Sequence, residues 1–186
     1  MGRLIVFNSI SLDGYFTDAN NDMSWAHKND PEWNDFTAEN AQGGGTLLLG
    51  RVTYDLLKSF WTTEKARQMM PEVAEGMNKI QKVVFSRTME NSDWNNTKVL
   101  KGNLIEEVKK MRGESGNSMV ILGSGSIVSQ LSEHRLIDEY QCVIVPIVLG
   151  KGRTMFEGMS EKLNLNRRDV RAFKNGNVVL SYQPVS

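Results

Sequence analysis

Three short polar segments of this 186-residue sequence carry side chains and glycines suited to phosphate, and each directly follows an apolar run. They are Gly50-Arg51-Val52-Thr53, Ser86-Arg87 and Gly123-Ser124-Gly125-Ser126. An arginine guanidinium binds phosphate oxygens in pairs. A glycine turn that leads into a helix exposes backbone N–H groups at the positive end of the helix dipole. Any one of these segments could serve helix packing alone, but the three together suit a nucleotide that carries several phosphates.

The elements that position these groups are predicted from hydrophobic periodicity. Met119–Leu122 is a continuous apolar run typical of a buried strand, and apolar residues then recur at helical spacing as far as Leu131. Ser126 suits the N-cap of that helix. Thr46–Gly50 is a second buried strand, after which Arg51 begins another helix. Because the carboxyl ends of parallel strands share one edge of a sheet, we expect the three segments to face one groove.

The remaining elements alternate between strands and helices as far as residue 135, and only strands follow. The further predicted strands are 3–10, 82–85, 97–100 and 136–149. The further predicted helices are 31–41 with Asp30 as N-cap, 64–79 with a break at Pro71, and 104–111. An Asn175-Gly176-Asn177 turn predicts a hairpin of residues 171–173 and 178–182. This order predicts an α/β fold in one domain, residues 1–186, whose mostly parallel sheet has an antiparallel edge.

Composition and the absence of certain motifs exclude several classes of protein. The 22 basic and 22 acidic side chains balance, so no overall charge favours nucleic acid or a membrane surface. The single cysteine, Cys142, has no intrachain partner, and with two histidines it cannot make a thiolate or imidazole metal cluster. No P-loop, G-x-S-x-G or H-E-x-x-H motif is present. The N-terminus has neither a signal peptide nor a membrane span, so we expect a cytoplasmic protein without a metal.

Four motifs in a fixed order resemble the dihydrofolate-reductase-like superfamily. They are L-L-L-G-R-V-T-Y, V-V-F-S-R, V-I-L-G-S-G-S and a late E-Y-x-x-x-I-V-P. The early S-L-D-G-Y and the run from Asp138 to Gly152 are more similar to the C-terminal reductase domain of the bifunctional riboflavin-biosynthesis deaminase–reductase. The resemblance spans roughly residues 3–183. It implies a three-layer fold with a central, mostly parallel mixed sheet that ends in a C-terminal antiparallel hairpin, and a homodimer.

The resemblance also implies NADPH as the cofactor and assigns residues to it. It assigns the 2′-phosphate and adenosine end, beside the tight turn at Gly50, to Arg51, Thr53, Ser86 and Arg87. It assigns the pyrophosphate to the backbone amides of Gly123, Ser124, Gly125 and Ser126. It assigns the nicotinamide to Ser9, Leu12 and Gly14. It assigns the substrate side to Tyr15 and Trp25.

The implied reaction transfers hydride from NADPH to a C=N or C=O carbon of a small heterocyclic substrate, as in 5-amino-6-(5-phosphoribosylamino)uracil reductase. Asp13 or Asp35 is the candidate proton donor, although Asp13 equally suits a turn. The chain departs from the riboflavin-type pattern at Leu122, where an acidic residue is usual, and it lacks the zinc-binding deaminase half. The alternatives are a pterin reductase-like activity, a non-catalytic NADPH-binding protein and an interaction module.

Overall fold

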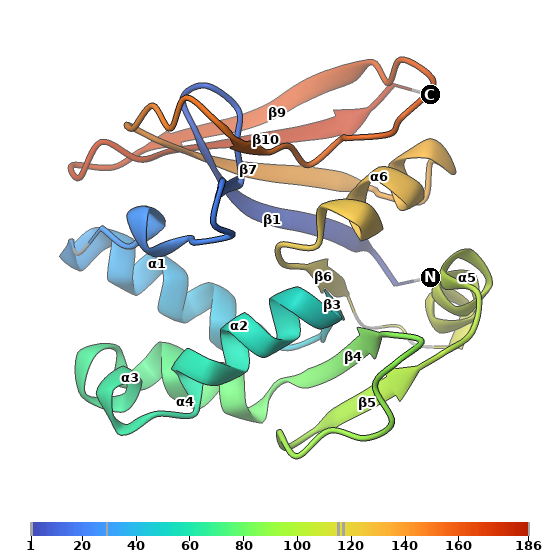
Figure 1. The fold of residues 1–186 in the computed structure, drawn as a ribbon. Coiled ribbons are helices and arrows are strands. Elements are labelled where there is room, and N and C mark those ends of the chain that lie inside the picture. The colour runs from blue at the N-terminus through green and yellow to red at the C-terminus, as the bar shows by residue number, and fades with distance from the viewer. Residues whose placement is uncertain (1, 29, 115, 117, 186) are drawn as a thin grey trace.

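The chain folds around one eight-stranded sheet, shown in Figure 1 by a computed structural model that describes residues 2–28, 30–114, 116 and 118–185. Its strands are β1 (Leu4–Ser11), β3 (Thr46–Gly50), β4 (Gln81–Phe85), β5 (Thr97–Leu100), β6 (Met119–Ile121), β7 (Glu139–Val145), β9 (Leu165–Ala172) and β10 (Val178–Pro184). Their spatial order is β5-β4-β3-β6-β1-β7-β10-β9. The first six are parallel to one another, and β10 runs antiparallel to both β7 and β9. This arrangement confirms the predicted mixed sheet with its antiparallel end.

Helices cover both faces of this sheet (Figure 1). The helices are η1 (Ser24–Ala26), α1 (Pro31–Gln42), α2 (Arg51–Trp61), α3 (Glu64–Met69), α4 (Pro71–Lys79), α5 (Leu104–Glu114) and α6 (Gly125–Glu133). Val108 of α5 and Val128 and Leu131 of α6 share one core with β1, β3, β4 and β6. Helices α1 to α4 share a second core with the opposite sides of β3 and β4. The molecule therefore has three layers, as the alternating strands and helices predict.

Local chemistry explains why most boundaries were predictable. The Asp30 side chain accepts a hydrogen bond of 3.1 Å from the backbone nitrogen of Trp33, so it caps α1 as predicted. Pro31 occupies the first turn of α1, and Pro71 begins α4 after the break that ends α3. The central strands are buried on both faces, and parallel strands of this kind are continuous apolar runs in the sequence.

Three predicted boundaries were wrong. The N-cap of α6 is Ser124, because the chain takes left-handed φ angles of 57° at Gly123 and 55° at Ser124, and Ser126 lies inside the first turn. The late β run is a strand only over Glu139–Val145. Strand β9 begins at Leu165, far before the predicted residue 171, and almost all of it is exposed. Such an exposed edge strand lacks the apolar alternation that identifies strands in a sequence.

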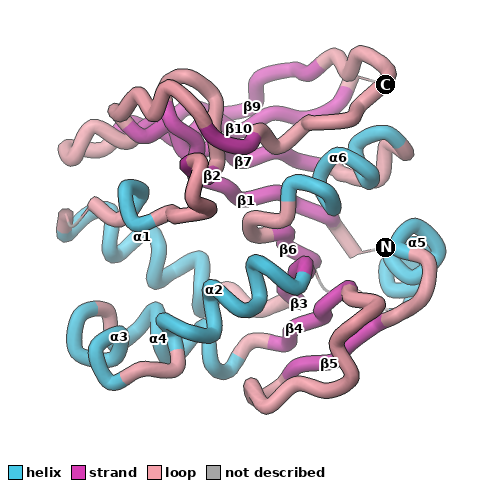
Figure 2. Tube along the Cα trace, in the orientation of Figure 1, coloured by secondary structure: helices cyan, strands magenta, loops and turns pink. Residues whose placement is uncertain are grey.

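A separate two-stranded ribbon lies beside the main sheet. It pairs β2 (Thr17–Asp18) with β8 (Gly152–Arg153) in antiparallel orientation. In Figure 2, β2 follows β1 and lies next to the start of α6. A Cβ built on Gly125, the first residue of α6, would lie 2.9 Å from the Phe16 ring, which shows how closely the ribbon approaches that helix. No helix in the described part of the chain is long and apolar enough to cross a membrane.

Candidate nucleotide-binding site

The turn before α6 is held in an unusual conformation by a buried asparagine. Asn8, on β1, is only 3% exposed. Its amide nitrogen donates to the carbonyl oxygen of Gly123 over 3.1 Å, and its amide oxygen accepts from the Gly123 backbone nitrogen. A Cβ on Gly123 would lie 2.8 Å from the side chain of Thr53, so only glycine fits there. The strand, the asparagine and the glycine together fix the direction in which α6 begins.

The same turn is bonded directly to the start of α2. Ser124 Oγ accepts a hydrogen bond from the backbone nitrogen of Gly50 over 2.7 Å and donates to Thr53 Oγ1 over 3.0 Å. The backbone nitrogen of Ser124 also donates to Thr53 Oγ1, over 3.0 Å. A hydroxyl has two acceptor positions and one proton. Both acceptor positions of Thr53 are therefore occupied. No acceptor for its proton is found among the described residues, so the hydroxyl can donate to an anion.

Both helices begin without a side-chain cap at the site. The N-cap of α2 is Gly50, which has no side chain to cap the helix. The N-cap of α6 is Ser124, whose side chain makes no capping hydrogen bond to its own helix. The nitrogens of Ile127 and Val128 donate to the carbonyl oxygen of Ser124. Within the described residues, no such bond is found for the N–H group of Gly125, the first residue of α6. Two helix N-termini with free N–H groups form a binding site for anions.

These two N-termini open on a cleft of ≈ 560 Å³ at the carboxyl ends of the parallel strands. The structure brings eight of the twelve predicted cofactor residues to this cleft: Gly50, Arg51, Thr53, Ser86, Arg87, Ser124, Gly125 and Ser126. Gly123 does not line the cleft but shapes it through its contacts with Asn8 and Thr53. The expectation that the three phosphate-suited segments share one groove is thus met by the geometry.

The charge on the cleft walls is positive. Arg51, Arg87, Lys101 and Arg153 line it, and no aspartate or glutamate is found among the described lining residues. Arg51 forms an exposed ion pair with Asp55 at 3.5 Å, which is worth little in water. No ion pair is found for Arg87 or Arg153 in the part of the chain that the structure describes. The cleft is therefore suited to a ligand with more than one negative charge.

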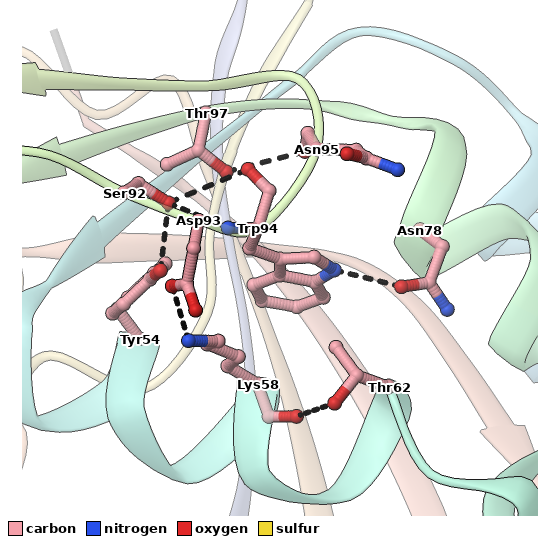
Figure 3. Close-up of polar contacts among 9 residues, drawn as sticks. All are labelled: Tyr54, Lys58, Thr62, Asn78, Ser92, Asp93, Trp94, Asn95 and Thr97. Atoms are coloured by element: carbon pink, nitrogen blue, oxygen red, sulfur yellow. Dashed lines mark hydrogen bonds and ion pairs between the residues drawn. The ribbon is translucent and has the colours of Figure 1, made fainter.

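The loop between β4 and β5 is bonded to α2 and α4 (Figure 3). The Tyr54 hydroxyl of α2 shares a hydrogen bond of 2.6 Å with the hydroxyl of Ser92 in this loop. The indole nitrogen of Trp94, two residues later, donates to Asn78 of α4 over 2.7 Å. Because Tyr54 follows Thr53 directly, these contacts restrict how far the start of α2 can move.

The predicted proton donors do not reach the cleft. The Asp13 carboxylate accepts hydrogen bonds from the backbone nitrogens of Leu149, at 3.1 Å, and Gly150, at 2.7 Å. A hydrogen bond from the Ser11 side chain, together with these two, lowers the pKa of Asp13 to about 2. Asp13 is therefore ionised and joins two loops, in agreement with the turn alternative. Asp35 is exposed on α1 and does not line the cleft.

The residues predicted for the nicotinamide and the substrate also lie outside the cleft. Ser9 is half-buried on β1, and Leu12 is 68% exposed. Gly14 has a φ of 90° in the turn after β1. Tyr15 is half-buried beside Gly152, and the indole nitrogen of Trp25 donates to the carbonyl oxygen of Asp22 over 3.0 Å. The roles predicted for these residues at the nicotinamide and the substrate therefore remain predictions.

Sequence reasoning missed several lining residues. Gln130 of α6 and His134, the C-cap of this helix, line the cleft together with Ser126. Their spacing of four residues places them along one side of the helix, a signal that the sequence does contain. Further lining residues come from the segments after β1, around the end of β5 and after β7: Phe16, Thr17, Asn21, Met23, residues 100–105 and Arg153. No local motif marks these, because only the tertiary fold brings them to the cleft.

The strand order, the C-terminal antiparallel pair and the position of the cleft define a dihydrofolate-reductase-like domain. A candidate riboflavin biosynthesis protein from Shewanella sp. PV-4 is similar, with a TM-score of 0.77, 23% identity and 99% of each chain covered. The diaminohydroxyphosphoribosylaminopyrimidine deaminase/5-amino-6-(5-phosphoribosylamino)uracil reductase of Thermotoga maritima has a TM-score of 0.71 and 15% identity, over 99% of this chain and 57% of that one. Dihydrofolate reductase from Enterococcus faecalis, complexed with NADP(H), has a TM-score of 0.63 and 13% identity, over 100% and 98%.

The chain belongs to the RibD C-terminal domain family, whose model matches residues 3–179. It is 28% identical over 182 residues to the uncharacterized protein YyaP of Bacillus subtilis (strain 168), covering 97% of this chain and 94% of YyaP. The predicted fold class and the predicted family resemblance are confirmed. Membership of this family supports an oxidoreductase of the riboflavin-pathway type.

Proposed function

We propose that this protein is an NADPH-dependent reductase that acts on a small heterocyclic substrate. The observation that carries the proposal is the meeting of Arg51, Arg87 and the N-terminus of α6 on one cleft. A nucleotide with a pyrophosphate and a ribose 2′-phosphate needs both kinds of group, because helix N–H groups suit the first and guanidinium groups suit the second. The Enterococcus faecalis dihydrofolate reductase, which shares the fold, is complexed with NADP(H).

The residues at the cleft fit this cofactor. The N–H groups at the start of α6 would hold the pyrophosphate, and the free proton of Thr53 would add a donor. Arg51 and Arg87 would hold the 2′-phosphate. NADPH supplies a hydride when bound, so the task of the protein is to bind and orient the two reactants. Among substrates, 5-amino-6-(5-phosphoribosylamino)uracil is supported by the family and by the name of the Thermotoga maritima protein.

A second candidate, a non-catalytic NADPH-binding protein, is favoured by one observation. No carboxylate lines the described cleft, and Asp13 is held ionised by three hydrogen-bond donors. In the reductase, the proton that follows the hydride would therefore have to come from water or from a titratable side chain other than a carboxylate, such as His134. Homodimer formation and a cytoplasmic location remain predictions for either candidate.

Two measurements on the purified protein test the proposal. Thermal unfolding with increasing NADPH reports binding, because a ligand that binds the folded state alone raises the melting temperature. Oxidation of NADPH is then followed with the uracil substrate and with dihydrofolate. We expect stabilisation by NADPH and turnover with the uracil substrate. Stabilisation without turnover on either compound would favour the non-catalytic candidate, and the absence of stabilisation would contradict both.

A further inference from the structure

Arg153 lies at the cleft and outside every motif that the sequence analysis identified. It ends β8, where it pairs with Thr17 of β2. Its side chain is exposed, and no hydrogen bond or ion pair is found for its guanidinium in the described part of the chain. The other cations of the cleft, Arg51, Arg87 and Lys101, follow strands β3, β4 and β5, whereas Arg153 comes after β7 on the other side of α6.

The ribbon that carries Arg153 is packed against the first turn of α6. The carbonyl oxygen of Thr154, the next residue, would lie 3.3 Å from a Cβ on Gly125. The backbone nitrogen of Phe16 donates to the carbonyl oxygen of Arg153 over 2.9 Å, and the Phe16 ring covers Gly125. Arg153 is thus attached to a backbone segment that contacts Gly125, the first residue of α6.

Two further features hold the ribbon in this place. A Cβ on Gly152 would lie 2.1 Å from the carbonyl oxygen of Thr17, so glycine is required for the close approach of the two strands. The Asp13 carboxylate accepts hydrogen bonds from Leu149 and Gly150, just before β8. The backbone position of Arg153 is therefore set by the fold before any ligand arrives, and only its side chain has to be ordered on binding.

We propose that Arg153 binds the pyrophosphate of the nicotinamide cofactor, from the side of α6 opposite Arg51 and Arg87. This inference rests on the proposed function and adds a cofactor-binding residue to it. Order along the sheet supports the assignment, because neighbouring strands are about 4.8 Å apart. The ends of β4 and β3 carry Arg87 and Arg51, and the end of β6 carries the α6 N-terminus. Arg153 belongs to the separate β2–β8 ribbon, which follows β1 and β7 on the other side of β6 and contacts Gly125 through Phe16 and Thr154. A phosphate at the start of α6 is then flanked by cations on both sides.

The test compares the Kd values of NADPH and NADH for wild type and Arg153→Ala, measured by calorimetry. The two cofactors share the pyrophosphate and differ in the 2′-phosphate. We expect Arg153→Ala to weaken both by the same factor, about 10-fold or more, as for a lost charge-assisted hydrogen bond. Arg153→Lys keeps the charge and should restore part of the affinity. Arg168→Ala, on the exposed strand β9, is the matched control and should change neither Kd.

Several results would overturn the inference while leaving the proposed function intact. Loss of affinity for NADPH alone would assign Arg153 to the 2′-phosphate. Unchanged Kd values with a raised KM for the substrate would assign it to the substrate. Unchanged Kd and KM values would leave it without a binding role. If wild type binds neither cofactor, the proposed function fails and this inference fails with it. Because Arg153 is exposed, the variant should keep its melting temperature.

Discussion

Arg87 shows how a residue can be identified from the sequence while its surroundings cannot. The Ser86-Arg87 pair was predicted to bind an anion because it follows a buried strand, and the structure places both residues on the cleft. Thr53 was predicted from the same kind of pattern, but its hydrogen bonds to Ser124 were not. Those bonds depend on two residues 71 positions apart, and no local signal contains that information.

Arg87→Ala should weaken the binding of NADPH more than the binding of NADH. The guanidinium has no ion pair within the described chain, so its loss removes binding without exposing an unpaired carboxylate. We expect the Kd of NADPH to rise by about 10-fold or more and that of NADH by a much smaller factor. Calorimetric titration measures both values. Arg67→Ala, on α3 outside the cleft, is the control, and equal losses for the two cofactors would refute the assigned role.

Lys82 should make the free energy of unfolding depend on pH in the alkaline range. It is 1% exposed, its Nζ donates to the carbonyl oxygen of Ile80 over 2.7 Å, and the same atom lies 4.5 Å from the centre of the Trp94 ring. Burial lowers the pKa of Lys82 to about 8. The unfolded chain, with the ordinary pKa of 10.5, therefore binds more protons between these two pH values. In this range the free energy of unfolding should rise with pH.

The comparison that isolates this effect is wild type against Lys82→Met. One pKa unit corresponds to about 1.4 kcal/mol, so the unfolding free energy of wild type should gain roughly 3 kcal/mol relative to the variant as the pH rises from 8 to 10.5. Below pH 8 the cost of the buried charge is present in full and the difference should be constant. Denaturant unfolding at a series of pH values measures it. Parallel pH profiles for the two proteins would disprove a lowered pKa.

At the level of the elements, the turn before α6 is the one that joins the parts of the site. It is bonded to β1 through Asn8 and to α2 through Thr53. The sequence predicted the strand, the glycines and the helix, but it placed the N-cap at Ser126 and not at Ser124. The error arose because serine rarely takes a positive φ, and here the bonds from Ser124 to Gly50 and Thr53 hold it there.

Gly123→Ala should disturb both stability and cofactor binding. The added methyl group would lie 2.8 Å from the Thr53 side chain, and φ is +57°. We expect a loss of about 1–3 kcal/mol in unfolding free energy and a weaker Kd for NADPH and NADH alike. Gly158→Ala is the matched control, because Gly158 has a φ of +86° with open space around its Cβ position. Equal destabilisation of the two variants would show that the contact with Thr53 is unimportant.

At the scale of the whole molecule, the sequence predicted the layers, the parallel sheet and the edge of the sheet where ligands bind. It did so because buried parallel strands and capped helices have strong local patterns. It missed most of strand β9, the β2–β8 ribbon and Arg153, since exposed edge strands and two-residue strands have no such pattern. The predicted proton donors, Asp13 and Asp35, were chosen by position relative to known motifs, and the fold directs both away from the cleft.

The central claim is that segments distant in the sequence together bind one phosphorylated nucleotide. A crystal structure of the protein soaked with NADPH tests it most directly. The account predicts the pyrophosphate at the N–H groups of Gly125 and Ser126, and the 2′-phosphate beside Arg51 and Arg87. A cleft that stays empty at saturating NADPH, or a nucleotide bound elsewhere on the molecule, would contradict the account.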